Sequence, residues 1–323
     1  MWPVCLAGES GAMITTEHLT KRYGGFTAVD DVTFTVEPGT VVGFLGPNGA
    51  GKSTAMRMMT GLTPPTSGRA LINGVPYARL RNPGRQVGVM LDASAQHPGR
   101  TGLETLRLVA LQLGVHRDRV DEMLALVGLS VDEASRRVRN YSLGMRQRLG
   151  LAAAFMGDPQ VLILDEPANG LDPQGIHWMR WLLKDFAARG GTVLLSSHLL
   201  HEIEAIADEL VVIGNGRIVA EGPLDDLLAS STTMVRSVAD AALTAALEDA
   251  GVQVTATPTG LSVAADPEEI ARLALAHEIV VLELRRGERA GLEDLFLSLT
   301  SDTDRAHPHR AARSDAATEG AAA

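Results

Sequence analysis

Eight consecutive residues have the types and spacing needed to hold a triphosphate. They are Gly46, Pro47, Asn48, Gly49, Ala50, Gly51, Lys52 and Ser53, which fit the pattern G-x-x-x-x-G-K-[ST] at every fixed position. Glycines permit a tight turn that brings backbone N–H groups close to an anion. The ammonium group of Lys52 can reach the outer phosphates, and the hydroxyl of Ser53 can bind Mg²⁺. The segment therefore predicts a triphosphate site. We expect Thr54, which follows Ser53, to be part of this nucleotide site.

The elements on either side must position this loop. Residues 41–45 form an apolar run that predicts a buried strand. Residues 52–60 predict a helix that ends at Gly61, because the prolines at 64 and 65 prevent its continuation. A helix N-terminus aimed at the loop is itself an anion site. The alternative is a chance match to the motif in a glycine-rich turn, which would not require a strand before it and a helix after it. The presence of both predicted elements therefore favours a triphosphate site.

A pair of adjacent carboxylates follows a second apolar strand. Residues 161–164 predict this strand, and Asp165 and Glu166 come directly after it. An α/β sheet places metal and phosphate chemistry at the C-terminal ends of its strands. We therefore expect Asp165 to bind Mg²⁺ and Glu166 to polarise a water for attack on the terminal phosphate. The alternative for Glu166 is a surface carboxylate in an ion pair.

Further motifs stand in the order found in the ATP-binding-cassette (ABC) family. The heptad Tyr141-Ser142-Leu143-Gly144-Met145-Arg146-Gln147 resembles the family's signature motif, and Asn169-Gly170-Leu171-Asp172 resembles its D-loop. His198, after the predicted strand 192–196, resembles the switch histidine. Tyr23 resembles the aromatic residue that stacks on adenine, although Phe26 is close enough in sequence to be that residue. The resemblance extends over residues 14–228.

This resemblance implies that ATP and Mg²⁺ are the cofactors and that the active form is a homodimer. In the family, two ATP molecules lie between two subunits, and neither subunit has a complete site alone. Ser142 and Gly144 are then expected to face the ATP of the second subunit, and Asp172 is expected at the nucleotide sites. Glu166 and His198 are the expected catalytic residues. From chemistry alone, Ser142 is able to cap a helix or bind an anion, and a simple cap is the alternative.

Two positions depart from the family pattern. Where the family has a glutamine that reaches Mg²⁺, this chain has Asp92, which is shorter and charged; Gln96 is a possible substitute. We therefore place Asp92 among the expected nucleotide-site residues. The signature has Leu143 where glycine is common, which limits backbone freedom, but Gly144 remains. Both departures resemble those of the branch that serves drug and antibiotic exporters.

The composition narrows the class of protein. The 323 residues carry a net charge of −10, which argues against a nucleic-acid-binding protein built on a broad basic face. No apolar run approaches the ~18 residues of a membrane-spanning helix. Cys5 is the only cysteine, which excludes an intrachain disulfide and suits a reducing cytosol. Taken with the family resemblance, these features imply a peripheral protein on the cytoplasmic face of the cell membrane, with a transmembrane permease subunit as its partner and no nucleic acid.

The pattern of elements predicts the fold class. Strand-like and helix-like runs alternate through most of the chain, which is typical of an α/β fold with a mixed or parallel sheet. We expect a P-loop NTPase domain of ABC type at residues 13–230, with a helical subdomain at 92–158. Residues 232–300 follow the order βαββαβ, which predicts a small ferredoxin-like α+β domain. Residues 1–12 and 301–323 are expected to be disordered.

The favoured hypothesis is the ATP-hydrolysing subunit of an exporter for drugs, antibiotics or other small molecules or lipids. A first alternative is a soluble ATPase of the same family that is not coupled to a transporter. Such proteins usually carry two cassettes or a long coiled coil, and this sequence has neither. A GTPase would need an Asn-Lys-x-Asp motif, which is absent. A binding protein without turnover is disfavoured by the presence of Glu166 and His198.

Overall fold

The computed structural model describes residues 12–92, 95–229, 233–258, 260–286 and 291–300. The chain divides into two compact units, of which the second spans Asp225–Leu295 and the first comprises the rest. Residues 1–11 and 301–323, which belong to the ends expected to be disordered, lie outside the described residues, and so do residues 230–232. The expected domain boundary between residues 230 and 232 stays a prediction.

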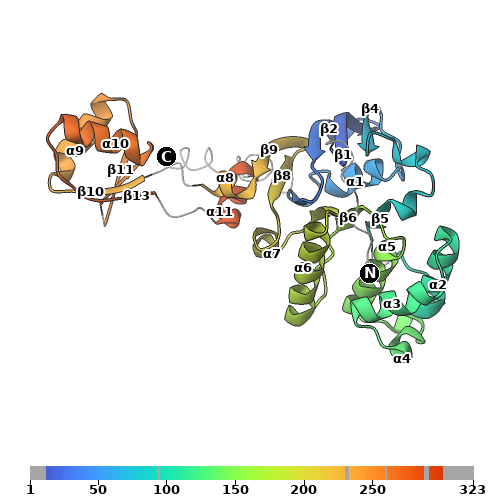
Figure 1. The fold of residues 1–323 in the computed structure, drawn as a ribbon. Helices are drawn as coiled ribbons and strands as arrows, with labels where there is room; N and C mark the ends of the chain where they lie inside the picture. The colour runs from blue at the N-terminus through green and yellow to red at the C-terminus, as the bar shows by residue number, and fades with distance from the viewer. Residues whose placement is uncertain (1–11, 93–94, 230–232, 259, 287–290, 301–323) are drawn as a thin grey trace, which may run out of the picture. The chain divides into compact units, whose positions relative to one another are not determined.

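A six-stranded sheet carries the predicted phosphate loop. Its strands occur in the order β5-β6-β7-β3-β8-β9, and all neighbours are parallel except β8 and β9. Their bounds are β3 (Val41–Leu45), β5 (Val87–Met90), β6 (Val161–Asp165), β7 (Thr192–Ser196), β8 (Glu209–Gly214) and β9 (Arg217–Pro223). Helix α1 (Lys52–Met59) lies on one side of these strands and α6 (Pro173–Ala188) on the other (Figure 1). Because both faces are covered, the central strands are solid apolar runs.

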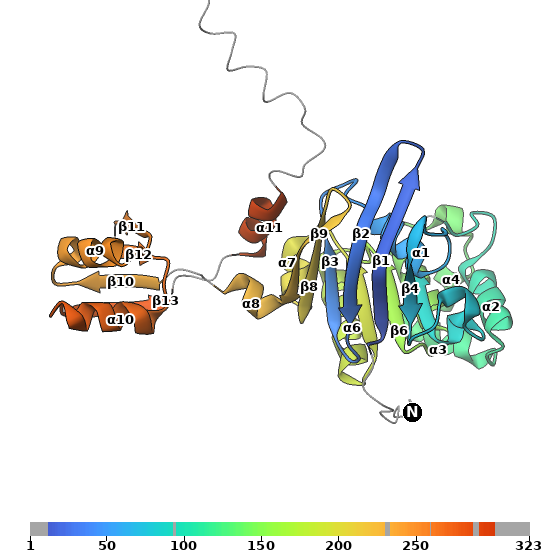
Figure 2. The same cartoon turned by 90° about the horizontal axis from the view of Figure 1, so that it is seen from above.

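A second, antiparallel sheet lies beside α1, and its strands have the order β2-β1-β4 (Figure 2). They are β1 (Ile14–Tyr23), β2 (Phe26–Val36) and β4 (Ser67–Ile72). No apolar run of the kind that identified the buried strands extends over residues 14–31, so the sequence did not predict the long β1–β2 hairpin. Its outer residues are exposed and polar, and a strand with one wet face lacks the solid apolar run that identified the central strands.

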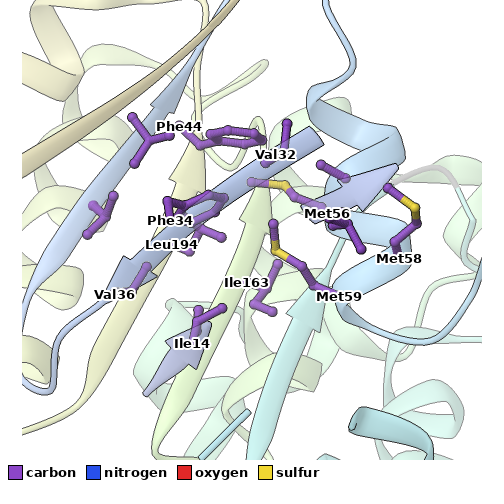
Figure 3. Packing of buried hydrophobic residues seen from close by; sticks show 14 of the residues in the cluster. Ile14, Val32, Phe34, Val36, Phe44, Met56, Met58, Met59, Ile163 and Leu194 are labelled. Atoms are coloured by element: carbon purple, nitrogen blue, oxygen red, sulfur yellow. The ribbon is translucent and has the colours of Figure 1, made fainter. Parts of the chain in front are cut away.

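The two sheets and α1 share one hydrophobic core. Met56, Met58 and Met59 of α1 are all buried in it. Phe34 of β2 stacks on Phe44 of β3 with ring centroids 5.7 Å apart. Figure 3 shows Met56 reaching toward these rings and Met59 toward the central sheet. The core thus fixes the first turn of α1, which carries Lys52, against the strand that precedes the phosphate loop.

The region between β5 and β6 is mostly helical, as the sequence predicted. It contains α2 (Gly102–Leu113), α3 (Asp118–Val127), α4 (Val131–Ala134) and α5 (Leu143–Phe155). Thr101 and Glu104 form a capping box at the start of α2, and Ser130 and Glu133 form another before α4. Short 3₁₀ turns occupy Tyr77–Arg79, Pro83–Arg85 and Val138–Asn140, and α7 (Leu200–Glu204) follows β7.

The second unit has the predicted βαββαβ order. Its elements are β10 (Thr233–Ser237), α9 (Asp240–Asp249), β11 (Val254–Thr257), β12 (Gly260–Val263), α10 (Pro267–Ala276) and β13 (Val281–Arg286). The sheet order is β11-β12-β10-β13 with antiparallel neighbours, so each helix connects strands that are separated by another strand. This is the split arrangement of a ferredoxin-like domain. Helices α8 (Leu224–Leu228) and α11 (Leu292–Thr300) stand before and after it in the sequence.

Candidate functional site

The predicted phosphate loop connects β3 to the N-terminus of α1. Gly49 and Gly51 have φ values of +82° and +114°, which side chains rarely tolerate. A Cβ at Gly51 would meet the Ala28 carbonyl, and one at Gly46 would meet the Ile213 carbonyl. The loop backbone at Gly46 and Gly51 therefore packs too closely against its neighbours to admit a side chain, and a tight turn of this kind brings backbone N–H groups up to an anion.

Lys52 lies at the floor of this cradle. Its ammonium Nζ donates to the Gly46 carbonyl at 2.5 Å and to the Pro47 carbonyl at 3.2 Å. Burial lowers the pKa of Lys52 below its ordinary value, while the carboxylates of Glu166 and Asp165 act in the opposite direction. Within the described residues, the hydrogen bonds of this buried cation go to neutral carbonyls, so an incoming phosphate is well placed to neutralise it.

Ser53 and Asp165, which come from separate motifs, are direct neighbours. The Ser53 hydroxyl donates to one carboxylate oxygen of Asp165 at 2.5 Å, and the Ser196 hydroxyl donates to the other. Hydroxyl and carboxylate oxygens are the ligands that Mg²⁺ prefers, and it usually takes one or two of them together with phosphate oxygens. The side chains present thus fit the expected metal.

Glu166 has an unusual backbone and is held from several sides. Its φ is +52°, in the left-handed region. Its backbone N–H donates to the Ser196 hydroxyl at 3.1 Å. One carboxylate oxygen lies 2.6 Å from Nδ1 of His198 and accepts the His198 backbone N–H at 3.2 Å. The two predicted catalytic residues are therefore brought together by the ends of β6 and β7.

A cavity of ≈ 420 Å³ opens above the loop. It is lined by Tyr23, Phe26, Ala28, Asn48, Gly49, Gly51, Lys52, Ser53, Thr54, Asp165 and Glu166. Tyr23 and Phe26 face each other across the β1–β2 turn, and both are half exposed. Both rings therefore remain candidates for stacking on a base, although Tyr23 is also within 5.0 Å of the Lys21 ammonium group. A larger cavity of ≈ 500 Å³, between Phe155 and Trp181, contains none of the predicted site residues.

The β8–β9 turn supports the phosphate loop from behind. The Gly216 N–H donates to the Ala50 carbonyl at 2.9 Å, and the Gly216 carbonyl accepts from Asp30 at 2.8 Å. Arg217 pairs with the Asp30 carboxylate at 2.6 Å. This support could not be predicted from the sequence, because it depends on a contact between segments that are far apart along the chain.

Ser142, Gly144 and Asp172 do not line the cavity of their own subunit. Ser142 caps α5 by accepting the Met145 N–H at 3.2 Å, and Asp172 caps α6 by accepting the Gly175 N–H at 2.8 Å. The side chain of Leu143 covers Gly170, so the signature turn and the D-loop lie against each other. Their expected roles toward nucleotide require a second subunit and stay predictions.

Asp92 and Gln96 also lie away from the cavity. Asp92 is exposed, and among the described residues neither side chain lines the nucleotide cavity. The Gln96 amide donates to the Arg146 carbonyl on α5 at 3.0 Å. In this structure, therefore, Gln96 contacts the signature helix, and the assignment of Asp92 to the glutamine position stays a prediction.

Asp92→Gln tests that assignment. If Asp92 occupies the glutamine position, the longer neutral amide gains a hydrogen bond in the ATP-bound state, which contributes about 0.5–1.5 kcal/mol. Steady-state phosphate release is then expected to rise about two- to tenfold. Asp249→Gln, the same change at an exposed residue of the second unit, is the control. Unfolding of Asp92→Gln, or an unchanged rate, would show that Asp92 has no such role.

Comparisons with known proteins agree with this geometry. The sequence profile of the ABC transporter family matches residues 29–169. The chain is 42% identical over 218 residues to the bacitracin transport ATP-binding protein BcrA of Bacillus licheniformis, and the match covers 67% of this chain and 71% of that protein. It is 37% identical over 214 residues to the lantibiotic transport ATP-binding protein SrtF of Streptococcus pyogenes, with coverage of 66% and 92%.

A solved structure of the ATP-binding subunit of an ABC transporter has the same fold. Its TM-score is 0.61 at 33% identity, and the match covers 67% of this chain and 91% of that chain. The cassette fold, the phosphate loop and the paired carboxylates together define an ATPase of the P-loop class. The chain belongs to the ABC transporter family, among its ATP-binding subunits. Within the described residues, no helix is both long and apolar enough to cross a bilayer.

Proposed function

We propose that this ATPase powers the export of an antibiotic or a related small molecule through a separate transmembrane permease subunit. The relatives named for bacitracin and lantibiotic transport support the choice of cargo class. The lack of a spanning helix in the described residues agrees with a peripheral subunit that depends on a membrane partner. Its location would be the cytoplasmic face of the membrane.

We propose further that each subunit binds MgATP in the cavity above its phosphate loop. Lys52 would bind the outer phosphates, and Ser53 and Asp165 would hold Mg²⁺, which supplies positive charge that stabilises the phosphates. Glu166 would accept a proton from the attacking water. His198 is close enough to Glu166 to orient the same water or to contact the terminal phosphate.

The observation that carries the dimer proposal is the position of Ser142. It begins a thirteen-residue helix, yet it lies outside its own subunit's nucleotide cavity. Helix N-termini attract anions because their N–H groups are unpaired and the helix dipole is positive there. A second copy would bring this N-terminus to the open side of the cavity and would complete the site.

Transport in inverted membrane vesicles tests the proposed function. The subunit would be produced together with the proposed transmembrane permease subunit, and labelled bacitracin or a labelled lantibiotic would be supplied outside. ATP-dependent accumulation that disappears with Glu166→Gln is the expected result. ATP hydrolysis that continues without accumulation, and without any response to the membrane protein, would instead favour the soluble ATPase.

A further inference from the structure

Gln147 is a buried amide on the signature helix that contacts the catalytic loop. It lies on α5 with only 4% of its surface exposed. Its Nε2 donates to the backbone carbonyl of Glu166 at 3.2 Å. Its Oε1 is also buried and has no hydrogen-bond partner among the described residues. Burying an amide oxygen without a hydrogen-bond partner costs free energy. The stability gained from hydrogen bonds of this amide therefore does not explain why position 147 is a glutamine.

The carbonyl that Gln147 contacts belongs to a strained residue. Glu166 has a positive φ, which a residue with a side chain adopts only when its surroundings enforce it. Ser196 accepts its N–H, His198 contacts its carboxylate, and Gln147 donates to its carbonyl. The contact from Gln147 is the one of these three that comes from α5.

The neighbours of Gln147 show that this part of α5 is anchored. Arg148 donates to the Val127 carbonyl at 2.6 Å, and its guanidinium group lies 4.7 Å from the centre of the Trp178 ring. The Arg146 carbonyl accepts from Gln96. Only Gln147 of these three side chains contacts the loop after β6. A shift of α5 would therefore reach the Glu166 backbone directly through this amide.

We propose that Gln147 is a positioning residue for ATP hydrolysis. By donating to the Glu166 carbonyl, Gln147 stabilises the left-handed backbone conformation that orients the Glu166 carboxylate. The same hydrogen bond couples the position of Glu166 to the position of α5, the helix that Ser142 caps. The inference rests on the proposed role of Glu166 as the group that activates water. It adds a connection between that group and the helix end assigned to the second subunit's ATP.

Gln147→Met tests this connection, because methionine has a similar length but cannot donate. Turnover is expected to fall about tenfold, corresponding to about 1.4 kcal/mol, while the Kd for MgATP changes less than about twofold. Gln147→Asn keeps the amide but is too short to reach the Glu166 carbonyl, so its turnover is expected to fall by the same factor. This variant replaces Gln147→Met if the methionine variant does not fold. Gln86→Met is the control, since the Gln86 amide donates to the Arg81 carbonyl away from the cavity.

The decisive measurement is the effect of Gln147→Met in a Glu166→Gln background. Single-turnover hydrolysis of labelled ATP is expected to show no further loss there, because the carboxylate that Gln147 positions is already absent. An equal fold-loss in both backgrounds, or no loss beside an intact Glu166, would overturn the inference alone. Wild-type turnover in Glu166→Gln itself would overturn the role of Glu166 and this inference together.

Discussion

Lys52→Ala is expected to weaken MgATP binding by at least about 100-fold. In the described part of the chain, the buried ammonium group donates hydrogen bonds to neutral carbonyls, so phosphate oxygens are its natural partners. Each hydrogen bond to a charged group contributes about 1.5–3 kcal/mol, and two such bonds give about 100-fold or more. Titration with a fluorescent ATP analogue, monitored with and without Mg²⁺, measures the effect.

Lys184→Ala is the matched control, because Lys184 is exposed on α6. It removes the same positive charge from the chain and is expected to leave ATP affinity unchanged. Lys52→Ala is not expected to lower the thermal unfolding midpoint, since burial already disfavours the charged form of Lys52. An unchanged Kd for MgATP in the Lys52 variant would contradict the role assigned to the phosphate loop.

Glu166→Gln is expected to lower turnover by a factor of about 10² to 10⁴ while ATP still binds. A glutamine preserves the shape of the side chain and can still contact His198, but it cannot accept a proton from water, and general-base catalysis is worth about this much. With hydrolysis blocked, two subunits are expected to remain closed around ATP. Phosphate release measures the first effect, and size-exclusion chromatography with ATP measures the second.

Glu204→Gln provides the comparison, because Glu204 is an exposed carboxylate on α7. Its turnover and elution volume are expected to match the wild type. If the Glu166 variant hydrolyses ATP at the wild-type rate, another group activates the water. If it stays monomeric in saturating ATP, the proposed nucleotide sandwich is wrong, whatever its rate.

The central sheet was predictable from the sequence because its strands are buried on both faces. The apolar runs at β3, β6 and β7 match the expected strands closely. The strands that the sequence missed, β1 and β9, are partly exposed and contain charged or turn-forming residues, so no continuous apolar run marks them. The βαββαβ order of the second unit was predictable because each short element has clear breaks at both ends.

Within the site, the residues of the phosphate loop and of the adjacent carboxylate pair were found together, and the contacts of two glutamines were not foreseen. Lys52, Ser53, Asp165 and Glu166 line one cavity because parallel strands end at the same edge of a sheet. Gln147 belongs to the signature heptad, but a glutamine inside a helix is ordinarily exposed, and only the packing of α5 shows that it is buried. The contact of Gln96 with α5 was likewise not predictable, because the two segments are far apart along the chain.

The turn at Gly216 constrains where this polypeptide can be shortened. That turn is bonded to Ala50 of the phosphate loop, and β9, which begins at Arg217, continues directly to the junction at Leu224. A minimal ATPase fragment must therefore retain the whole hairpin through Pro223. Deletion back through Gly216 would remove the N–H that pairs with the Ala50 carbonyl. A loss of nucleotide affinity in such a fragment would reflect damage to the cradle rather than a task of the missing domain.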